Sequence, residues 1–187
     1  MKNWEELKQE CNACEKCELC QTRNNVVFGV GNEQADILFV GEGPGEQEDL
    51  TGIPFVGPAG KLLDDMLSII DLDRECNCYI ANIVKCRPPR NRDPQESEQD
   101  ACIGYLEEQV RLLRPKIIVC LGRIAAKRLM DPEIRITRQH GQWMQKNGIW
   151  MCAIYHPSAL LRDVSKRPET FADLLSIRDK LKEVKEI

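Results

Sequence analysis

Four short apolar runs constrain the fold of this chain more than any other feature. They occupy residues 37–40, 79–84, 116–121 and 150–155, and most are continuously apolar instead of alternating with polar residues. Continuous apolar runs of this length are typical of strands that are buried on both faces of a parallel sheet. The runs therefore predict a central, mainly parallel sheet of four strands.

Helical patterns separate these runs. Asp93 is a candidate N-cap, and Pro94 is the expected first residue of a helix that ends near Leu113. Asn147-Gly148 predicts a two-residue hairpin turn before the last strand. Because helices alternate with strands, we expect an α/β fold with three layers, α/β/α. The other predicted helices cover 60–72, 122–130 and 170–184.

Length and composition fit one soluble domain. A chain of 187 residues can bury a core without help from a metal, and no run approaches the roughly 18 apolar residues of a membrane span. The polar stretch from Met1 to Glu6 is not followed by the apolar segment of a secretory signal. We therefore expect a single domain, residues 1–187, in the cytoplasm, where thiols stay reduced.

The chain has ten cysteines, and four of them follow one another at a regular spacing, Cys11-x2-Cys14-x2-Cys17-x2-Cys20. In a reducing compartment such a pattern indicates metal binding instead of disulfide bonds. Thiolate ligands select zinc or an iron–sulfur cluster. By spacing alone the run is similar to that of a ferredoxin, although its third gap is one residue short and no proline follows.

Chemically distinctive residues follow the predicted strands. The loop Gly41–Gly45 comes after the first strand, and Glu46 stands where a dinucleotide fingerprint requires glycine. Asn82 lies inside an apolar run, where its amide needs a partner, and His156 follows the last run. Phe55 stands in a loop rich in Gly and Pro. Since the carboxyl ends of parallel strands share one edge of a sheet, we expect a ligand site there.

Together these motifs resemble the family 4 uracil-DNA glycosylases, the iron–sulfur branch of that superfamily. Each motif would be weak alone, but their order and joint presence are highly specific. The resemblance covers most of the chain. The matching segments are Cys14-x2-Cys17-x-Leu19-x3-Arg23, Val26–Gly29, Gly41–Asp49, Gly52–Gly57, Asn82–Pro89 and His156–Arg162.

The resemblance implies a monofunctional DNA glycosylase that flips uracil out of DNA and hydrolyses its N-glycosidic bond. Free uracil is released, and an abasic site remains for base excision repair. Asn82 would hydrogen-bond the edge of uracil, and Phe55 would stack on its ring. His156, with backbone N–H groups of the glycine loop, would stabilise the negative charge that builds on uracil O2.

The resemblance leaves the position of the attacking water open between two carboxylates. Related glycosylases carry a carboxylate at the third position of the first motif, but Gly43 stands there in this chain, as in family 4. Glu48, Glu42 or the backbone alone would then hold the water. We favour Glu48.

The resemblance also implies a 4Fe–4S cluster with two ligands from the amino-terminal motif and two from the middle of the chain. Its role would be structural, because it joins residues 11–23 to the 86–102 region beside the DNA groove and takes no part in the chemistry. Cys11 and Cys20 lie outside the family pattern, so ligand exchange or a different registration stays open. The implied ligands are Cys14, Cys17, Cys86 and Cys102.

The implied partner is uracil-containing DNA, which a monomer associated with the nucleoid would bind without contacting a membrane. Leu160 or Leu161 would wedge into the base stack. One branch of the superfamily couples covalently to abasic DNA through a histidine, but residues 90–94 contain none. Phosphate contacts, which make binding dependent on salt, are expected from Lys85, Arg87 and Arg162.

Two alternatives remain at this point. A non-enzymatic iron–sulfur protein that transfers electrons or senses redox state would use the run from Cys11 to Cys20 and leave Asn82 and His156 with structural roles. The second alternative is a zinc-dependent protein that binds nucleic acid without catalysis. The net charge of -4 does not exclude nucleic-acid binding, because binding depends on a local basic face.

Overall fold

The computed structural model describes residues 2–186 and contains one six-stranded sheet with the strand order β1-β3-β2-β4-β6-β5. The four inner strands pair in parallel and coincide with the four apolar runs. The predicted α/β/α fold is confirmed, although the sheet has six strands instead of four. The inner strands are β2 (Ile37–Gly41), β3 (Tyr79–Asn82), β4 (Ile117–Leu121) and β6 (Ile149–Ile154).

Two short edge strands account for the difference. β1 (Val30–Gly31) and β5 (Met144–Lys146) each pair antiparallel with their neighbours. Neither forms an apolar run, because an edge strand is short and its side chains are largely accessible to water. The predicted turn at Asn147-Gly148 joins β5 to β6, and both residues have positive φ, as a two-residue hairpin requires.

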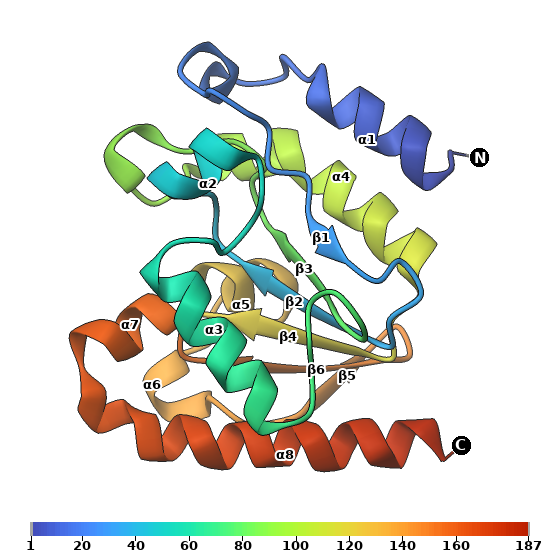
Figure 1. Ribbon diagram of the computed structural model, residues 1–187, viewed down its shortest axis with the longest axis vertical. Coiled ribbons are helices and arrows are strands. Elements are labelled where there is room, and N and C mark those ends of the chain that lie inside the picture. Colours follow the sequence, from blue (N-terminus) through green and yellow to red (C-terminus); the bar gives the residue numbers. More distant parts are fainter. Residues whose placement is uncertain (1, 187) are drawn as a thin grey trace.

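Helices cover both faces of the sheet (Figure 1). Successive residues of β2 point to opposite cores, so Leu38 and Val40 belong to one core, whereas Ile37 and Phe39 belong to the other. The first core is covered by α1 (Trp4–Asn12), α4 (Glu96–Leu113) and α5 (Arg123–Leu129). The second is covered by α3 (Pro58–Ile69), α7 (Pro157–Arg162) and α8 (Arg167–Lys185).

Shorter helical segments lie in the connections. They are α2 (Glu46–Thr51), α6 (Ile136–Gln139) and the 3-10 turns η1 (Glu18–Gln21), η2 (Pro89–Asn91) and η3 (Val164–Lys166). Within residues 2–186 no helix combines the length and the apolar character needed to cross a bilayer.

The start of α4 differs from the prediction. The helix begins at Glu96, with Gln95 as its N-cap, and the Gln95 N–H donates to Glu98 Oε2 at 2.8 Å. Asp93 was the expected cap, but its carboxylate accepts from Arg123 Nη2 at 2.7 Å. Asp93 therefore forms a tertiary ion pair instead of capping the helix, as its position in the sequence had indicated.

Candidate functional site

A cleft with a volume of about 940 Å³ opens at the carboxyl ends of the parallel strands. The loops that follow β2, β4 and β6 line it, together with Asn82 at the end of β3. The edge of the sheet predicted from the sequence is therefore the edge that carries the cleft. The predicted site residues that line it are Glu42, Gly43, Glu48, Phe55, Asn82, His156 and Arg162.

Asn82 presents an unsatisfied acceptor in this cleft. The residue is 2% exposed, and its Oδ1 has no hydrogen-bond partner among the described residues. A buried acceptor without a partner costs about 1–3 kcal/mol. Gly41 lies so close that a Cβ there would come within 2.5 Å of Asn82 Oδ1 and of the Phe55 ring. Only glycine permits this approach, which sets the amide beside the aromatic ring.

Phe55 is held in a strained backbone conformation by one side chain from α2 and one from the loop after α3. Its φ is 53°, in the left-handed region that phenylalanine rarely adopts. Arg74 donates to the carbonyls of Pro54 and Phe55, both at 2.7 Å. Glu48 Oε1 accepts from the N–H groups of the next two residues, at 3.2 and 3.4 Å. The loop is therefore fixed before any ligand arrives.

His156 carries a defined neutral tautomer. Its Nδ1 accepts from the backbone N–H of Ser158 at 3.1 Å, so the ring proton lies on Nε2. The Ser158 hydroxyl lies 2.7 Å from the same nitrogen. Burial lowers the pKa of His156 to about 4, and the charge of Arg162 acts in the same direction. The imidazole is therefore neutral at pH 7, and its centroid lies 5.6 Å from that of Phe55.

Glu42 has a strongly shifted pKa. Its pKa is raised to about 7, first by burial and then by nearby Asp93, whereas the charge of Arg123 lowers it. A carboxyl group that titrates near neutral pH is typical of residues that exchange protons during catalysis.

Sequence reasoning missed several residues of this site. Ser158 lies in the segment His156–Arg162, but no role was predicted for it. Arg123 directly follows the glycine after β4, and it too had no predicted role. Arg74 lies outside every motif, so no local signal connects it with the Phe55 loop.

Two of the residues expected to contact DNA do not lie where that role requires. Lys85 is 1% exposed, so it cannot reach a phosphate. Leu160 is also 1% exposed and packs in the core, whereas the next residue, Leu161, is 43% exposed. The expectation of a phosphate contact is wrong for Lys85, and Leu161 alone of the leucine pair is accessible to a base stack. Arg87 is partly exposed and donates to Asn91 Oδ1 at 2.7 Å.

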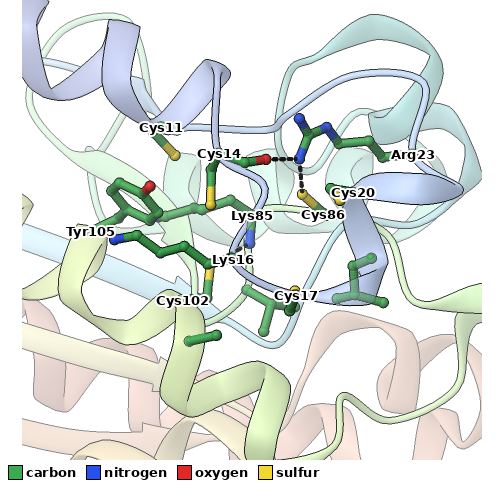
Figure 2. Close-up of a pocket in the computed structure, with 13 residues that line it drawn as sticks. Cys11, Cys14, Lys16, Cys17, Cys20, Arg23, Lys85, Cys86, Cys102 and Tyr105 are labelled. Carbon is green, nitrogen blue, oxygen red and sulfur yellow. Dashed lines mark hydrogen bonds between the residues drawn. The ribbon is translucent and has the colours of Figure 1, made fainter.

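A second pocket gathers six of the ten cysteines (Figure 2). The amino-terminal segment supplies four, the loop after β3 supplies one, and α4 supplies one. None of the ten cysteines forms a disulfide. The pocket therefore brings together all four cysteines implied by the family resemblance, and it includes both that the resemblance left out. The six are Cys11, Cys14, Cys17, Cys20, Cys86 and Cys102.

Cations lie against these thiols. Arg23 Nη1 donates to the carbonyl of Cys14 at 2.6 Å and to Cys86 Sγ at 3.4 Å, as the dashed lines in Figure 2 show. Burial raises the pKa of Cys86 to about 11, and Arg23 opposes this rise. Burial likewise raises the pKa of Cys102, whereas the charge of Lys85 and its backbone N–H, 3.3 Å from the sulfur, lower it.

The donor set fits an iron–sulfur cluster in its chemistry. It consists of soft sulfur atoms from three segments of the chain, and the adjoining cations compensate the charge of thiolates. Within residues 2–186 no three His, Cys, Asp or Glu side chains are arranged as they stand to ligate a metal ion.

Comparison with known proteins gives consistent similarities. Residues 28–181 match the model of the Uracil DNA glycosylase superfamily. The chain is 46% identical to a type-4 uracil-DNA glycosylase of Archaeoglobus fulgidus, over 95% of this chain and 92% of that protein. It is 44% identical to a type-4 uracil-DNA glycosylase of Thermotoga maritima, over 85% of this chain and 83% of the other. A type-5 uracil-DNA glycosylase of Pyrobaculum aerophilum is 34% identical over 54% of this chain and 46% of its own length.

Proposed function

The chain belongs to the uracil DNA glycosylase superfamily, and from this membership we propose how its residues release uracil from DNA. The activity is that of a DNA glycosylase, which hydrolyses the N-glycosyl bond of uracil. The two non-enzymatic alternatives are set aside, because neither an electron carrier nor a zinc-dependent binding protein accounts for this membership. The roles of individual residues and of the thiol pocket are the substance of the proposal.

The unsatisfied Oδ1 of Asn82 is the observation that carries the proposal. Uracil presents an N3–H donor beside the O4 acceptor, so the amide accepts from N3–H and donates to O4. Cytosine presents an N3 acceptor beside an amino donor, which would leave the buried amide unpaired. The mismatch costs a few kcal/mol per unsatisfied group, which is the source of discrimination.

Phe55 provides the stacking surface for the flipped base. Its ring borders Gly41 and lies near the imidazole of His156, so a flat ligand that reaches Asn82 also meets this ring. The loop bonds from Arg74 and Glu48 remove the entropic cost of ordering the platform when the base enters. A uracil in this position is surrounded on its edge and on one face.

His156 stabilises the charge of the leaving base. Cleavage of the glycosidic bond places negative charge on uracil O2, and the Nε2–H of the neutral imidazole donates to it. A neutral donor held by Ser158 needs no rearrangement during the reaction. Loss of one such donor costs about 2.7–4 kcal/mol in comparable sites.

Glu42 is the better candidate of the two carboxylates for holding the attacking water. Glu48 has one oxygen committed to the backbone after Phe55, so it acts first as a positioning residue for that loop. Glu42 lines the cleft and makes no such bond to the loop of Phe55, although it shares a hydrogen bond with Asp93. Its ionised form accepts a proton from water as the bond forms.

Leu161 and two arginines serve the DNA itself. Leu161 is exposed on α7 next to the cleft, where it fills the space that the flipped base leaves in the stack. Arg162 lines the cleft, and Arg87 lies on the loop after Cys86; we assign a phosphate contact to each. Binding then weakens as salt rises.

A 4Fe–4S cluster in the thiol pocket would be held by Cys14, Cys17, Cys86 and Cys102. When bound, the cluster supplies iron–thiolate bonds that tie the amino-terminal segment to the loop between Cys86 and Cys102, and it supplies no chemistry to the substrate. That loop also carries Asp93, which adjoins Glu42. The cluster thus supports one wall of the cleft.

The test of this proposal is the variant Asn82→Asp assayed on DNA with a single uracil or a single cytosine. The wild-type protein should release free uracil and leave no denaturant-resistant adduct with DNA. The variant should lose uracil release or accept cytosine, while its absorbance in the blue and its iron content stay unchanged. Unchanged uracil release by the variant would remove Asn82 from its role.

A further inference from the structure

Lys85 is buried without a carboxylate partner. It is 1% exposed, and its ammonium group donates to Gln109 Oε1 at 2.6 Å. No carboxylate within residues 2–186 forms an ion pair with it. Burial disfavours the charged form of a lysine, and a neighbouring anion favours it.

The contacts of Lys85 orient it but do not neutralise it. Gln109 is fully buried, and its Nε2 donates to the carbonyl of Phe28 at 2.9 Å. Oε1 of Gln109 is thereby fixed as the acceptor that faces the ammonium. The ring of Phe28 lies 6.0 Å from Nζ, a distance at which a cation–π contact is weak. Neither group carries a negative charge.

The source of negative charge is the thiol pocket, which Lys85 lines together with the six cysteines. Its backbone N–H donates to Cys102 Sγ at 3.3 Å, so the lysine adjoins one of the proposed cluster ligands directly. Resting on the cluster of the proposed function, we propose that Lys85 is the buried counter-cation of that cluster. An iron–sulfur core with four thiolates is anionic. A fixed cation nearby lowers the free-energy cost of burying this anion in the protein.

This role differs from that of Arg23. Arg23 bonds a sulfur directly but is only partly buried, so water screens its charge. Lys85 makes no bond to sulfur from its side chain, but its charge acts through the interior with little screening. The charge of Lys85 is therefore expected to affect the retention and the reduction potential of the cluster more strongly than the charge of Arg23 does.

The experiment compares Lys85→Met with Lys85→Arg in the holoprotein. Methionine keeps the apolar stem and removes the charge, whereas arginine keeps the charge. Lys182→Met is the matched control, because Lys182 is an exposed lysine on α8. Iron and acid-labile sulfide per chain, the rate of iron loss to a chelator, and the reduction potential by film voltammetry are measured for each protein.

Lys85→Met should lose iron to the chelator about tenfold faster or more, and its potential should become more negative, because a nearby cation favours the reduced, more anionic cluster. Lys85→Arg and the control should stay near wild type. If Lys85→Met does not accumulate, the arginine variant decides: wild-type iron retention supports the role, and iron loss overturns it. Wild-type retention and potential in a soluble Lys85→Met would also overturn it.

The measurement separates this inference from the proposed function. Wild-type protein that contains no iron or sulfide refutes the cluster itself, before any variant is considered. Wild-type protein that contains the cluster but releases no uracil refutes the proposed route of catalysis and leaves the role of Lys85 to its own test.

Discussion

The uracil cleft and the thiol pocket differ in how far the polypeptide alone completes them. In the cleft, protein groups hold one another: Arg74 and Glu48 fix the loop of Phe55, and Ser158 fixes the tautomer of His156. In the thiol pocket, burial raises the pKa of Cys86 to about 11, and the buried ammonium of Lys85 donates to Gln109 and forms no ion pair with a described carboxylate. A site for an uncharged base is built by backbone hydrogen bonds, whereas a site for a charged cofactor is completed by that cofactor.

One loop belongs to both regions. Cys86 before the loop and Cys102 in α4 after it line the thiol pocket, and Asn91, Arg92 and Asp93 in the loop line the cleft. A disturbance of the thiol pocket is therefore expected to reach the cleft, but changes of single side chains in the cleft should leave the thiols intact. The following variants test this asymmetry.

The largest effect is expected from His156→Leu. Leucine removes the Nε2–H donor, so kcat/KM for uracil release should fall about 10²- to 10³-fold. Iron content should stay at the wild-type level, because the residue lies only in the cleft. Activity within about threefold of wild type, a free-energy difference of only about 0.65 kcal/mol, would show that another group stabilises the leaving base.

Cys86→Ser changes the thiol pocket, and its effect should reach the cleft through the shared loop. A hard hydroxyl replaces a soft thiolate, so most iron should be lost, and thermal unfolding should occur at least about 5 °C lower. Uracil release should fall about tenfold in parallel with iron, since the wall of the cleft loosens (about 1.4 kcal/mol). Cys76→Ser is the control, because Cys76 is exposed and outside the pocket. Full activity in iron-free protein would break the link between the two regions.

Leu161→Ala and Leu160→Ala form a matched pair on α7. Truncation of the exposed Leu161 should lower activity on duplex DNA by about three- to tenfold, with little change in stability, since the wedge is shortened. Truncation of the buried Leu160 should lower the free energy of unfolding by about 2–5 kcal/mol. Denaturant unfolding and single-turnover assays measure the two effects. A reversed pattern would assign the wedge to Leu160.

The smallest and most specific effect is expected from Glu42→Gln in the pH profile. The pKa of Glu42 is raised to about 7, so wild-type activity should decline as pH falls through about 7, where the carboxylate becomes protonated. The variant should be slower above this pH and lack this limb. Single-turnover rates across the neutral range would show it, and a limb that persists in the variant would assign the titration to another group.

The same carboxyl group affects stability with a known sign. Its folded-state pKa lies above the ordinary value of 4.5, so it contributes stability below that value, and the contribution is lost as pH rises through about 7. Glu42→Gln should abolish that part of the pH dependence of unfolding.

The inner strands and the position of the cleft were predictable because they depend on local patterns. Apolar runs define the buried strands, and the parallel topology places their carboxyl ends on one edge, which brings Asn82 and His156 together. The start of α4 was not predictable, because Asp93 pairs with Arg123, a residue 30 positions away. The role of Arg74 was not predictable for the same reason, because its partners are backbone carbonyls of a loop about 20 residues earlier in the chain.

By itself, the sequence determined the α/β class, the order of the motifs and the density of thiols, since each is a property of residue type and spacing. Only the tertiary structure decided that Leu161 is exposed and Leu160 buried, that Lys85 is buried beside the thiol pocket, and that six of the ten cysteines share that pocket. Burial and the partner of a charged group depend on segments far apart in the chain. No local pattern contains that information, because solvent exclusion arises only when those segments pack.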